Sequence, residues 1–370
     1  MALPSTGKLG FGLMRLPKDG DRIDIAQTSR MVDRFLAAGF TYFDTAWAYP
    51  GSEEAIRKAL VERHPRDAFL LASKNAAWLG CKSAAEATAQ LDTSLARSGA
   101  GHFDFYLLHN LGETRTRVFD DWGLWDWALR QRDAGRIRHL GFSFHSTAGE
   151  LDAILRAHPE AEFVQLQINY ADWESPSIQS RLCLETARAH GKPVIVMEPV
   201  KGGLLAKPPA DVAAVLRATE PGSSEASWAL RFAADCEGVY TVLSGMSSTA
   251  QMDDNLAAMR GFAGLTDAQR ATLRRAREAL AAHPIVPCTS CDYCAKACPA
   301  SIGISGSFTA LNILELYGDK ARAKDQEGWL VGAQGRKRAA ECLQCGACEK
   351  VCPQHIAIRD TLARAAAALA

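Results

Sequence analysis

The chain has 370 residues, which exceeds one ordinary domain and suggests two or three. Lys plus Arg and Asp plus Glu each number 42, so there is no net charge to attract nucleic acid or an anionic membrane. No apolar run approaches the length of a membrane span, and the first residues lack the basic start and apolar core of a signal peptide. We therefore expect a cytoplasmic protein that binds neither nucleic acid nor membrane.

Short β-branched or aromatic runs alternate with amphipathic stretches from residue 8 to about 260. The predicted strands are residues 10–16, 42–46, 69–75, 103–109, 137–144, 163–170, 193–199 and 239–245. The predicted helices between them include residues 24–38, 53–63, 83–98, 122–134 and 147–158. Eight strand–helix repeats indicate a parallel sheet, and eight such strands close naturally into a (β/α)8 TIM barrel. The rival, an open doubly wound sheet for dinucleotides, would need G-x-G-x-x-G after the first strand, where only Gly10-Phe11-Gly12 is present.

Capping residues stand at the ends of the predicted helices. Predicted N-caps are Asp24, Ser83, Thr147 and Thr249, and predicted C′ glycines are Gly39, Gly99, Gly135 and Gly191. One more helix is predicted over residues 266–282, after which His283, Pro284 and Pro287 stiffen the chain. We therefore expect the barrel to cover residues 1–282 and a second domain to cover residues 283–370.

Eight cysteines in the second domain repeat one pattern, C-x2-C-x2-C-x3-C followed by proline. The two runs are Cys288, Cys291, Cys294 and Cys298, then Cys342, Cys345, Cys348 and Cys352. This spacing is typical of ferredoxins with two clusters, in which the fourth cysteine of each run reaches the other cluster. We expect one [4Fe-4S] cluster on the first three cysteines with Cys352, and a second on Cys342, Cys345 and Cys348 with Cys298.

Zinc is the alternative ligand for C-x2-C pairs, but four cysteines per run with a trailing proline, given twice, fit it less well. Disulfides are disfavoured because nothing else in the chain looks secreted. The segment between the two runs is long, and residues 308–317 within it have helical periodicity. The sequence therefore predicts a small, mostly helical ferredoxin-like iron–sulfur domain after the barrel.

Four polar residues stand at the carboxyl ends of successive predicted strands, where TIM barrels place their active sites. Asp44 and Tyr49 follow the second strand, Lys74 ends the third, and His109 ends the fourth. A phenol near pKa 10 is a weak acid, and a cation within hydrogen-bond reach lowers that pKa. We expect Lys74 to act in this way.

In this interpretation the Asp44 carboxylate holds the ammonium group of Lys74, and His109 either orients the substrate oxygen or relays a proton. Such a tyrosine can serve as general acid for carbonyl reduction and as general base for alcohol oxidation. Each residue also has a structural explanation when taken alone: a capping aspartate, a solvated lysine, a loop tyrosine, a buried histidine. Four of them at successive strand ends are much harder to explain as structure.

Several sequence blocks resemble those of the aldo/keto reductase family, in order from residue 8 to about 260. The block 43–49, FDTAWAY, followed by GSEEA at 51–55, resembles the family's D-T-A-x-x-Y and G-x-S-E signature. The segments ASK at 72–74 and YLLH at 106–109 match its next two signatures. The added cluster domain is similar to an iron–sulfur-bearing branch of this family.

The resemblance implies a bound NAD(P)H across the barrel mouth and a small carbonyl or alcohol substrate. Ser143 and Gln165 would then hold the nicotinamide carboxamide. Near the pyrophosphate the resemblance places Gly202, Gly203 and Leu204, where glycine lets backbone N–H groups approach closely. At the adenosine end it places Gly245, Ser247, Gln251 and Asn255.

The chain departs from the family pattern at the adenosine end. Members that bind NADPH usually carry Lys or Arg where this chain has Gly245 and Gln251, and a 2′-phosphate is best held by a cation. The choice between NADH and NADPH therefore stays open. Phe144 also stands where many members have Asn.

Three functional hypotheses follow from these two parts. The first is a carbonyl reductase or alcohol dehydrogenase whose clusters are structural or sense redox state. The second is an oxidoreductase that passes substrate electrons through the clusters to a redox partner protein or a quinone-like acceptor. The third is a ferredoxin-like carrier on an inactive barrel, against which the complete set of four residues argues. The sequence shows no flavin fingerprint that would join hydride chemistry to one-electron clusters.

Overall fold

The structure is a computed structural model that describes residues 3–332 and 334–370. The chain forms two compact units. The first comprises the residues up to 206 together with 220–273, and the second comprises 207–219 together with 274–370. The predicted sequence boundary at residue 283 stays a prediction about where the iron–sulfur domain begins.

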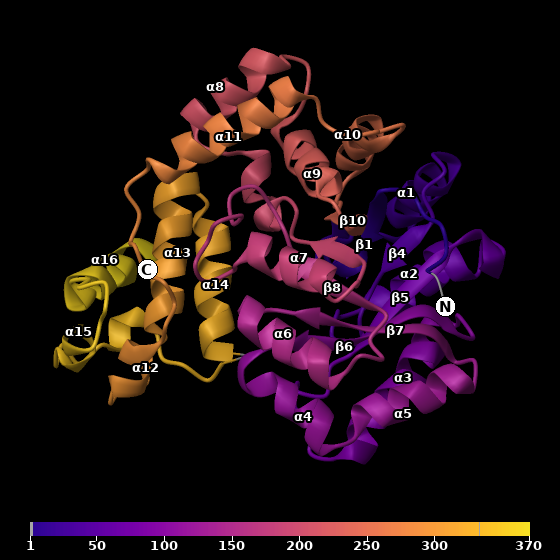
Figure 1. Cartoon of the computed structure of the whole chain (residues 1–370), viewed down its shortest axis with the longest axis horizontal. Coiled ribbons are helices and arrows are strands. Elements are labelled where there is room, and N and C mark those ends of the chain that lie inside the picture. Colours follow the sequence, from indigo (N-terminus) through magenta and orange to yellow (C-terminus); the bar gives the residue numbers. More distant parts are fainter. Residues whose placement is uncertain (1–2, 333) are drawn as a thin grey trace. The chain divides into compact units, whose positions relative to one another are not determined.

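The first unit is built on a closed barrel of eight parallel strands (Figure 1), as predicted. The strands are β1 Leu9–Gly12, β4 Tyr42–Asp44, β5 Leu70–Asn75, β6 Phe103–Leu111, β7 Ile137–Phe144, β8 Phe163–Gln167, β9 Val194–Met197 and β10 Val239–Gly245. Neighbours follow the chain order, and β1 closes the ring between β4 and β10. A separate two-stranded sheet pairs β2 Lys18–Asp19 with β3 Arg22–Ile23.

The main difference from the predicted strands lies at β1, which ends at Gly12 instead of continuing to residue 16. A 3-10 helix, Leu13–Arg15, follows. Side chains donate hydrogen bonds to the backbone carbonyl groups of this segment: Ser52 Oγ donates to Leu13 O at 3.0 Å and Ser247 Oγ donates to Arg15 O at 2.7 Å. Because these carbonyl oxygens already accept hydrogen bonds, the segment does not require a neighbouring strand to satisfy them.

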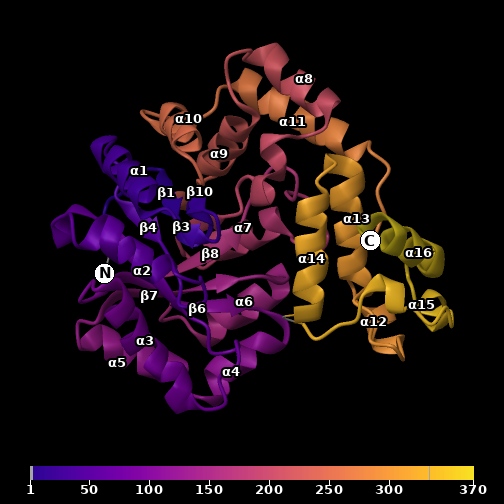
Figure 2. The same cartoon turned by 180° about the vertical axis from the view of Figure 1, so that it is seen from behind.

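Helices surround the barrel and pack their apolar faces on it (Figures 1 and 2). They are α1 Ile25–Ala37, α2 Ser52–Ile56, α3 Ala84–Ser98, α4 Thr116–Asp121, α5 Leu124–Asp133, α6 Ala148–Ala157, α7 Ser180–Ala189, α9 Glu225–Asp235 and α10 Thr249–Met259. The predicted helix over residues 53–63 is split, because α2 passes into a π-helix at Arg57–Val61.

The capping predictions hold at most positions. The side chains of Asp24 and Ser83 accept from backbone N–H groups in the first turns of α1 and α3. Thr147 caps α6 by position but without a side-chain bond, and the N-cap of α10 is Ser248 instead of Thr249. All four predicted C′ glycines have positive φ: Gly39, Gly99, Gly135 and Gly191. Only glycine enters this left-handed region without strain, which explains why the helices end where they do.

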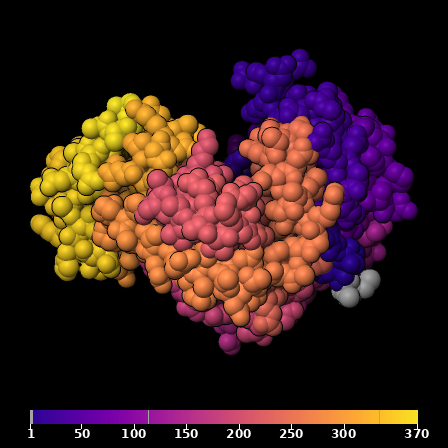
Figure 3. All heavy atoms as spheres, turned by 90° about the horizontal axis from the view of Figure 1, so that it is seen from above, coloured from indigo at the N-terminus to yellow at the C-terminus, as the bar shows by residue number. Residues whose placement is uncertain are grey.

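The second unit is helical, as predicted for the iron–sulfur domain. Its helices are α8 Ala210–Thr219, α12 Tyr293–Ala297, α13 Ile304–Tyr317, α14 Lys320–Gly332, α15 Ala347–Lys350 and α16 Ile358–Leu369, together with the carboxyl-terminal part of α11 Asp267–Ala281. Helix α8 lies beside α11 (Figures 1 and 2, and from above in Figure 3), and His283 Nε2 lies 3.1 Å from the Asp211 carboxylate of α8.

Close helix packing forms the core of this unit. Gly306 on α13 has no room for a side chain, because a Cβ there would lie 2.2 Å from Leu330 of α14. The buried core includes Ile302, Phe308, Leu311, Ile358 and Leu362. No helix among residues 3–332 and 334–370 is long and apolar enough to cross a membrane.

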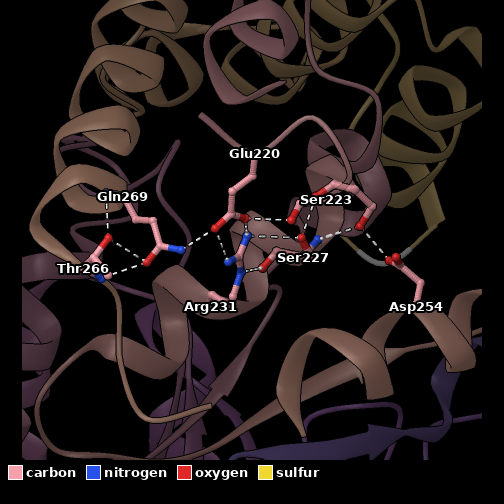
Figure 4. A network of polar contacts seen from close by, with 8 residues as sticks. Glu220, Ser223, Ser227, Arg231, Asp254, Thr266 and Gln269 are labelled. Carbon is pink, nitrogen blue, oxygen red and sulfur yellow. Dashed lines mark hydrogen bonds and ion pairs between the residues drawn. The ribbon is translucent and has the colours of Figure 1, made fainter. Parts of the chain in front are cut away.

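A buried arginine on α9 is the centre of a polar network in the first unit (Figure 4). Arg231 on α9 donates to both carboxylate oxygens of Glu220, at 2.7 and 3.2 Å. Gln269 at the start of α11 and Ser223 donate to the same carboxylate. These bonds, chiefly the one from Arg231, lower the pKa of Glu220 to about 2. The network fixes the start of α9 against the chain that leaves the barrel.

We expect Glu220→Gln to lower the free energy of unfolding at pH 7 by about 2 kcal/mol, since it removes the charge that pairs with a buried arginine. Urea unfolding followed by tryptophan fluorescence would measure the loss. Glu62→Gln is the matched control, because Glu62 pairs with Arg57 on the surface and surface pairs contribute little. Equal stability of the two variants would contradict a structural role for the network.

Candidate active site and iron–sulfur sites

The loop between β4 and α2 carries Tyr49 and is fixed by its own side chains. Thr45 Oγ1 and Ser52 Oγ are 2.7 Å apart, and both residues are buried. Gly51 adopts φ 72°, which turns the chain into α2. The buried Glu53 then accepts from Ser73 Oγ of β5 at 2.8 Å. The sequence block that resembles the family signature therefore forms a rigid loop over the carboxyl ends of β4 and β5.

Lys74 and Asp44 form a buried ion pair at those strand ends. Lys74 Nζ lies 2.5 Å from Asp44 Oδ1, and the two side chains are 0% and 5% exposed. Lys74 Nζ also donates to Thr45 O at 2.7 Å. Burial alone would lower the pKa of Lys74, but the Asp44 carboxylate raises it above its ordinary value. Lys74 is therefore a fixed cation at neutral pH.

Tyr49 lies within reach of this cation, as predicted. Its hydroxyl group is 3.5 Å from Lys74 Nζ, and the ammonium group is 4.8 Å from the centre of the phenol ring. The expected fall in the pKa of Tyr49 is not found: burial raises the pKa, and Lys74 opposes this only in part because Asp44 acts the other way. The phenol is therefore protonated at neutral pH, as a general acid must be before it donates.

His109 completes the group of four. Its ring lies 6.0 Å from the ring of Tyr49 and nearly perpendicular to it, with the Trp78 ring 6.3 Å away on another side. Burial, with a further effect of the Lys74 charge, holds the pKa of His109 well below its usual range. The imidazole is therefore neutral. Its Nδ1 atom has no hydrogen-bond partner among the described residues.

Gln165 and Ser143 lie beside the four residues, and both already have partners within the protein. Gln165 Nε2 donates to Asp44 Oδ2 at 3.1 Å, and Gln165 is 2% exposed. Ser143 Oγ accepts from the Asn110 N–H at 2.7 Å, so its own hydroxyl proton stays available to a ligand. Asn110 itself adopts φ 66°, in the left-handed region.

The remaining predicted cofactor residues lie on two loops. Gly202 and Gly203 adopt φ 66° and 99°, and a Cβ at Gly203 would meet nothing within 4 Å, whereas Leu204 is buried. On the second loop, the Ser247 N–H donates to Gln251 Oε1 at 2.7 Å, and the buried Asn255 donates to Ser244 Oγ at 2.7 Å. Gly245 is exposed.

Two cations near these loops were missed by the sequence analysis. Lys201, directly before the glycine pair, forms an ion pair with the buried Asp172. Asp172 also accepts from Asn169 Nδ2 at 2.8 Å. Arg15 lies 3.7 Å from Glu198, which precedes the glycine loop. The position of Lys201 directly before Gly202 could have identified it as a candidate cofactor residue. Its partner Asp172 follows another strand, and no sequence motif indicates the pairing.

The eight cysteines of the two runs line two separate cavities. Cys288, Cys291 and Cys294 line one of them together with Cys352. Cys342, Cys345 and Cys348 line the other together with Cys298. The structure thus brings together the two sets of four that the spacing predicts.

This arrangement fits a cluster better than a single ion. Among residues 3–332 and 334–370, no three His, Cys, Asp or Glu side chains lie close enough to share one metal ion. A zinc site needs all four sulfurs at about 2.3 Å from one centre. The cysteines instead surround a cavity, and none of the eleven is in a disulfide. The donor set of four thiols per cavity suits a [4Fe-4S] cluster.

The Lys74–Asp44 pair yields a stability prediction. Asp44→Asn should lower the free energy of unfolding by about 3–5 kcal/mol, because it leaves a buried ammonium group without its anion. Adding Lys74→Met should restore much of this loss, since the unpaired charge is then absent. Urea unfolding of the two single variants and the double variant closes the cycle. A double variant less stable than Asp44→Asn alone would contradict the buried ion pair.

Comparison with known proteins agrees with this fold. Residues 8–278 match the sequence model of the aldo/keto reductase family, and residues 287–357 match that of a 4Fe-4S dicluster domain. A solved aldo-keto reductase from Bacillus halodurans, in its holo form, is 24% identical, with a TM-score of 0.58, over 74% of this chain and 95% of that one. One from Klebsiella pneumoniae, in complex with NADPH, is 23% identical, with a TM-score of 0.59, over 72% and 90%.

Curated relatives match a shorter part of the chain. An aldo-keto reductase from Strobilurus tenacellus is 29% identical over 210 residues, which are 54% of this chain and 59% of that protein. One from Mycolicibacterium smegmatis is 29% identical over 139 residues, which are 38% of this chain and 46% of that protein. The matches thus span about half the length of these relatives. From the family match over most of its length, the chain belongs to the aldo/keto reductase family and carries a 4Fe-4S dicluster domain after the barrel.

Proposed function

We propose that this protein is an NAD(P)H-dependent oxidoreductase that interconverts a carbonyl and an alcohol on a small molecule, with Tyr49 as general acid and base. The observation that carries this proposal is the buried Lys74–Asp44 ion pair within hydrogen-bond reach of the Tyr49 hydroxyl group. The position of the pair at the carboxyl ends of barrel strands supports it, since TIM barrels carry their chemistry there. The family membership of the chain agrees with this reaction type.

Each of the four residues has a role in the reduction. Tyr49 donates its proton to the carbonyl oxygen, and the nearby ammonium group of Lys74 stabilises the phenolate that remains. Asp44 keeps Lys74 charged and in place. The neutral imidazole of His109 can hydrogen-bond the same oxygen and orient it. NAD(P)H, when bound, supplies the hydride.

Several residues fit the cofactor. Ser143 and Gln165 would hold the carboxamide, and the backbone around Gly202, Gly203 and Leu204 would meet the pyrophosphate. Gly245, Ser247, Gln251 and Asn255 would lie along the adenosine end. The space that the left-handed Gly203 leaves open supports a close approach of a ligand. The NADPH in the Klebsiella relative supports a nicotinamide dinucleotide in general, and the missing cations at Gly245 and Gln251 leave NADH equally acceptable.

Tyr49→Phe should lower kcat/KM for carbonyl reduction by about 10²- to 10⁴-fold, the usual effect of losing a general acid. Binding of NADH or NADPH, followed by fluorescence titration, should be unchanged. Since the pKa of Tyr49 is raised, the reduction rate of the unaltered enzyme should stay level through neutral pH and fall only in alkali. Alcohol oxidation should rise with pH, because it needs the deprotonated phenol.

The assay would use a panel of sugars, aldehydes and quinones, with both cofactors, on anaerobic protein of measured iron content. Tyr240→Phe is the control, because its hydroxyl group donates to Pro4 O at the opposite end of the barrel strands. Full activity of the Tyr49 variant would reject the assigned general acid.

For the clusters, we propose that the eight cysteines bind two [4Fe-4S] clusters with a structural or redox-sensing role. Cys291→Ala and Cys345→Ala should then lower iron content and stability but leave turnover per folded molecule unchanged. Both cysteines are exposed, so the substitutions disturb little packing. A loss of turnover in proportion to iron, in well-folded protein, would reject this role.

A second candidate function is electron transfer from substrate through the clusters to a redox partner protein or a quinone-like acceptor. The observation that favours it is that the last cysteine of each run, Cys298 or Cys352, lines the cavity of the other run. This arrangement holds the two sites together in one small unit. Rapid mixing with NADH or substrate would then bleach the cluster absorption, near about 400 nm, on the timescale of turnover. An unchanged spectrum would reject this candidate.

A further inference from the structure

The two cysteine runs fold as repeats of one another. Ser290 and Gln344, each two positions after the first cysteine, have φ 55° and 56°, and each donates its N–H to that cysteine's sulfur at 3.4 Å. Three positions after the last cysteine, Ser301 and His355 have φ 55° and 52°. Corresponding positions in the two runs therefore occupy corresponding places around their cavities.

Two such pairs of positions differ in charge. After the second cysteine the first run has Asp292, whereas the second run has Gly346. Seven positions after the fourth cysteine the first run has Ser305, whereas the second has Arg359. Ser305 Oγ donates to Asp292 Oδ1 at 2.7 Å. In the second run, Arg359 lies over the glycine, with its Cζ 3.7 Å from where a Cβ of Gly346 would be.

The charges that face the two cavities are therefore opposite. Of the described residues that line the cavities, apart from the cysteines, Asp292 is the only charged one at the first, and Arg359 is the only charged one at the second. Glu349 pairs with Arg359 at 2.9 Å and offsets part of its charge, but Glu349 does not line the cavity. The guanidinium group is thus the charge that lines the second cavity.

Other features are matched between the runs. Lys296 and Lys350 stand at corresponding positions, and the N–H bonds to sulfur have the same length. Both cavities are lined by four cysteine side chains. Three further corresponding pairs of residues differ, but all six side chains are uncharged: Thr289 and Leu343, Ala300 and Gln354, Phe308 and Leu362. Among the described residues that line the cavities, Asp292 and Arg359 are therefore the charged difference.

We propose that Asp292 and Arg359 give the two clusters different reduction potentials, with the cluster of Cys298, Cys342, Cys345 and Cys348 the easier to reduce. Reduction adds one negative charge to a cluster, which a neighbouring guanidinium group stabilises and a neighbouring carboxylate opposes. This inference rests on the cluster ligands proposed above. With both clusters bound, an electron would be favoured on the second cluster over the first: its transfer would oxidise the first by one electron, reduce the second by one, and require no proton.

The experiment is an anaerobic redox titration of the full-length chain with both clusters, followed by electron paramagnetic resonance. Two one-electron steps should appear, with midpoint potentials at least about 59 mV apart. This separation means that the reduced-to-oxidised ratios of the two clusters differ at least tenfold at any one applied potential. Arg359→Gln should lower the potential of the first step, and Asp292→Asn should raise that of the second. Each shift should be about 59 mV, which is a tenfold change in the reduced-to-oxidised ratio. Because the two variants act on different steps, either one tests the assignment if the other fails to load iron.

Arg364→Gln is the matched control, since Arg364 lies on the same helix as Arg359 but pairs with Glu315 and lines neither cavity. It should leave both steps in place. Coincident steps in the unaltered protein, or a shift of the wrong step in either variant, would overturn the inference. Iron below two clusters per chain would instead reject the proposed ligands, which keeps the two failures distinguishable.

Discussion

The candidate active site depends on one buried ion pair, Lys74 with Asp44. The register of the sheet sets it up: Asp44 pairs with Ala72, and Lys74 is two residues further along β5 on the same face. Burying two charges is costly unless every polar atom finds a partner. Thr45 O accepts a hydrogen bond from the Lys74 ammonium group, and Gln165 donates to the second carboxylate oxygen of Asp44. The pair is thus held by the strand that carries the tyrosine loop and by a strand across the barrel.

This pair also affects the pKa of Tyr49. A lone cation beside a phenol would lower its pKa, and the sequence analysis assumed that case. Burial has the largest effect and raises the pKa of Tyr49, Lys74 lowers it, and Asp44 offsets part of the Lys74 effect, so the phenol keeps its proton. The cation acts when negative charge develops on the phenol oxygen, since Asp44 and Thr45 already hold it in position. An unpaired lysine at this depth would instead lose its own proton.

Much of the fold and the site could be predicted from local patterns, and the failures have physical reasons. The alternation of strands and helices gave the barrel, and the C′ glycines were correct because their left-handed backbone admits few other residues. The order of Asp44, Tyr49, Lys74 and His109 along the strands was sufficient to place them together. The early end of β1 and the Lys201–Asp172 pair depend on partners distant in the sequence. The direction of the Tyr49 pKa shift was missed because burial outweighs a neutralised cation.

The cysteine runs show how far a repeat can be read from sequence. Their spacing alone predicted which cysteines share a cavity. The short spacing keeps the first three thiols of a run together, and the fourth thiol is directed to the other site. The difference between the two sites lies in the residues between and after the cysteines, where Asp292 corresponds to Gly346 and Ser305 to Arg359. If the position of Gly346 carried a carboxylate, as Asp292 does in the first run, Arg359 would form an ion pair with it. Gly346 adopts φ 73°, and a Cβ there would lie 3.7 Å from Arg359 Cζ, so the guanidinium group lies directly over the glycine at the second cavity.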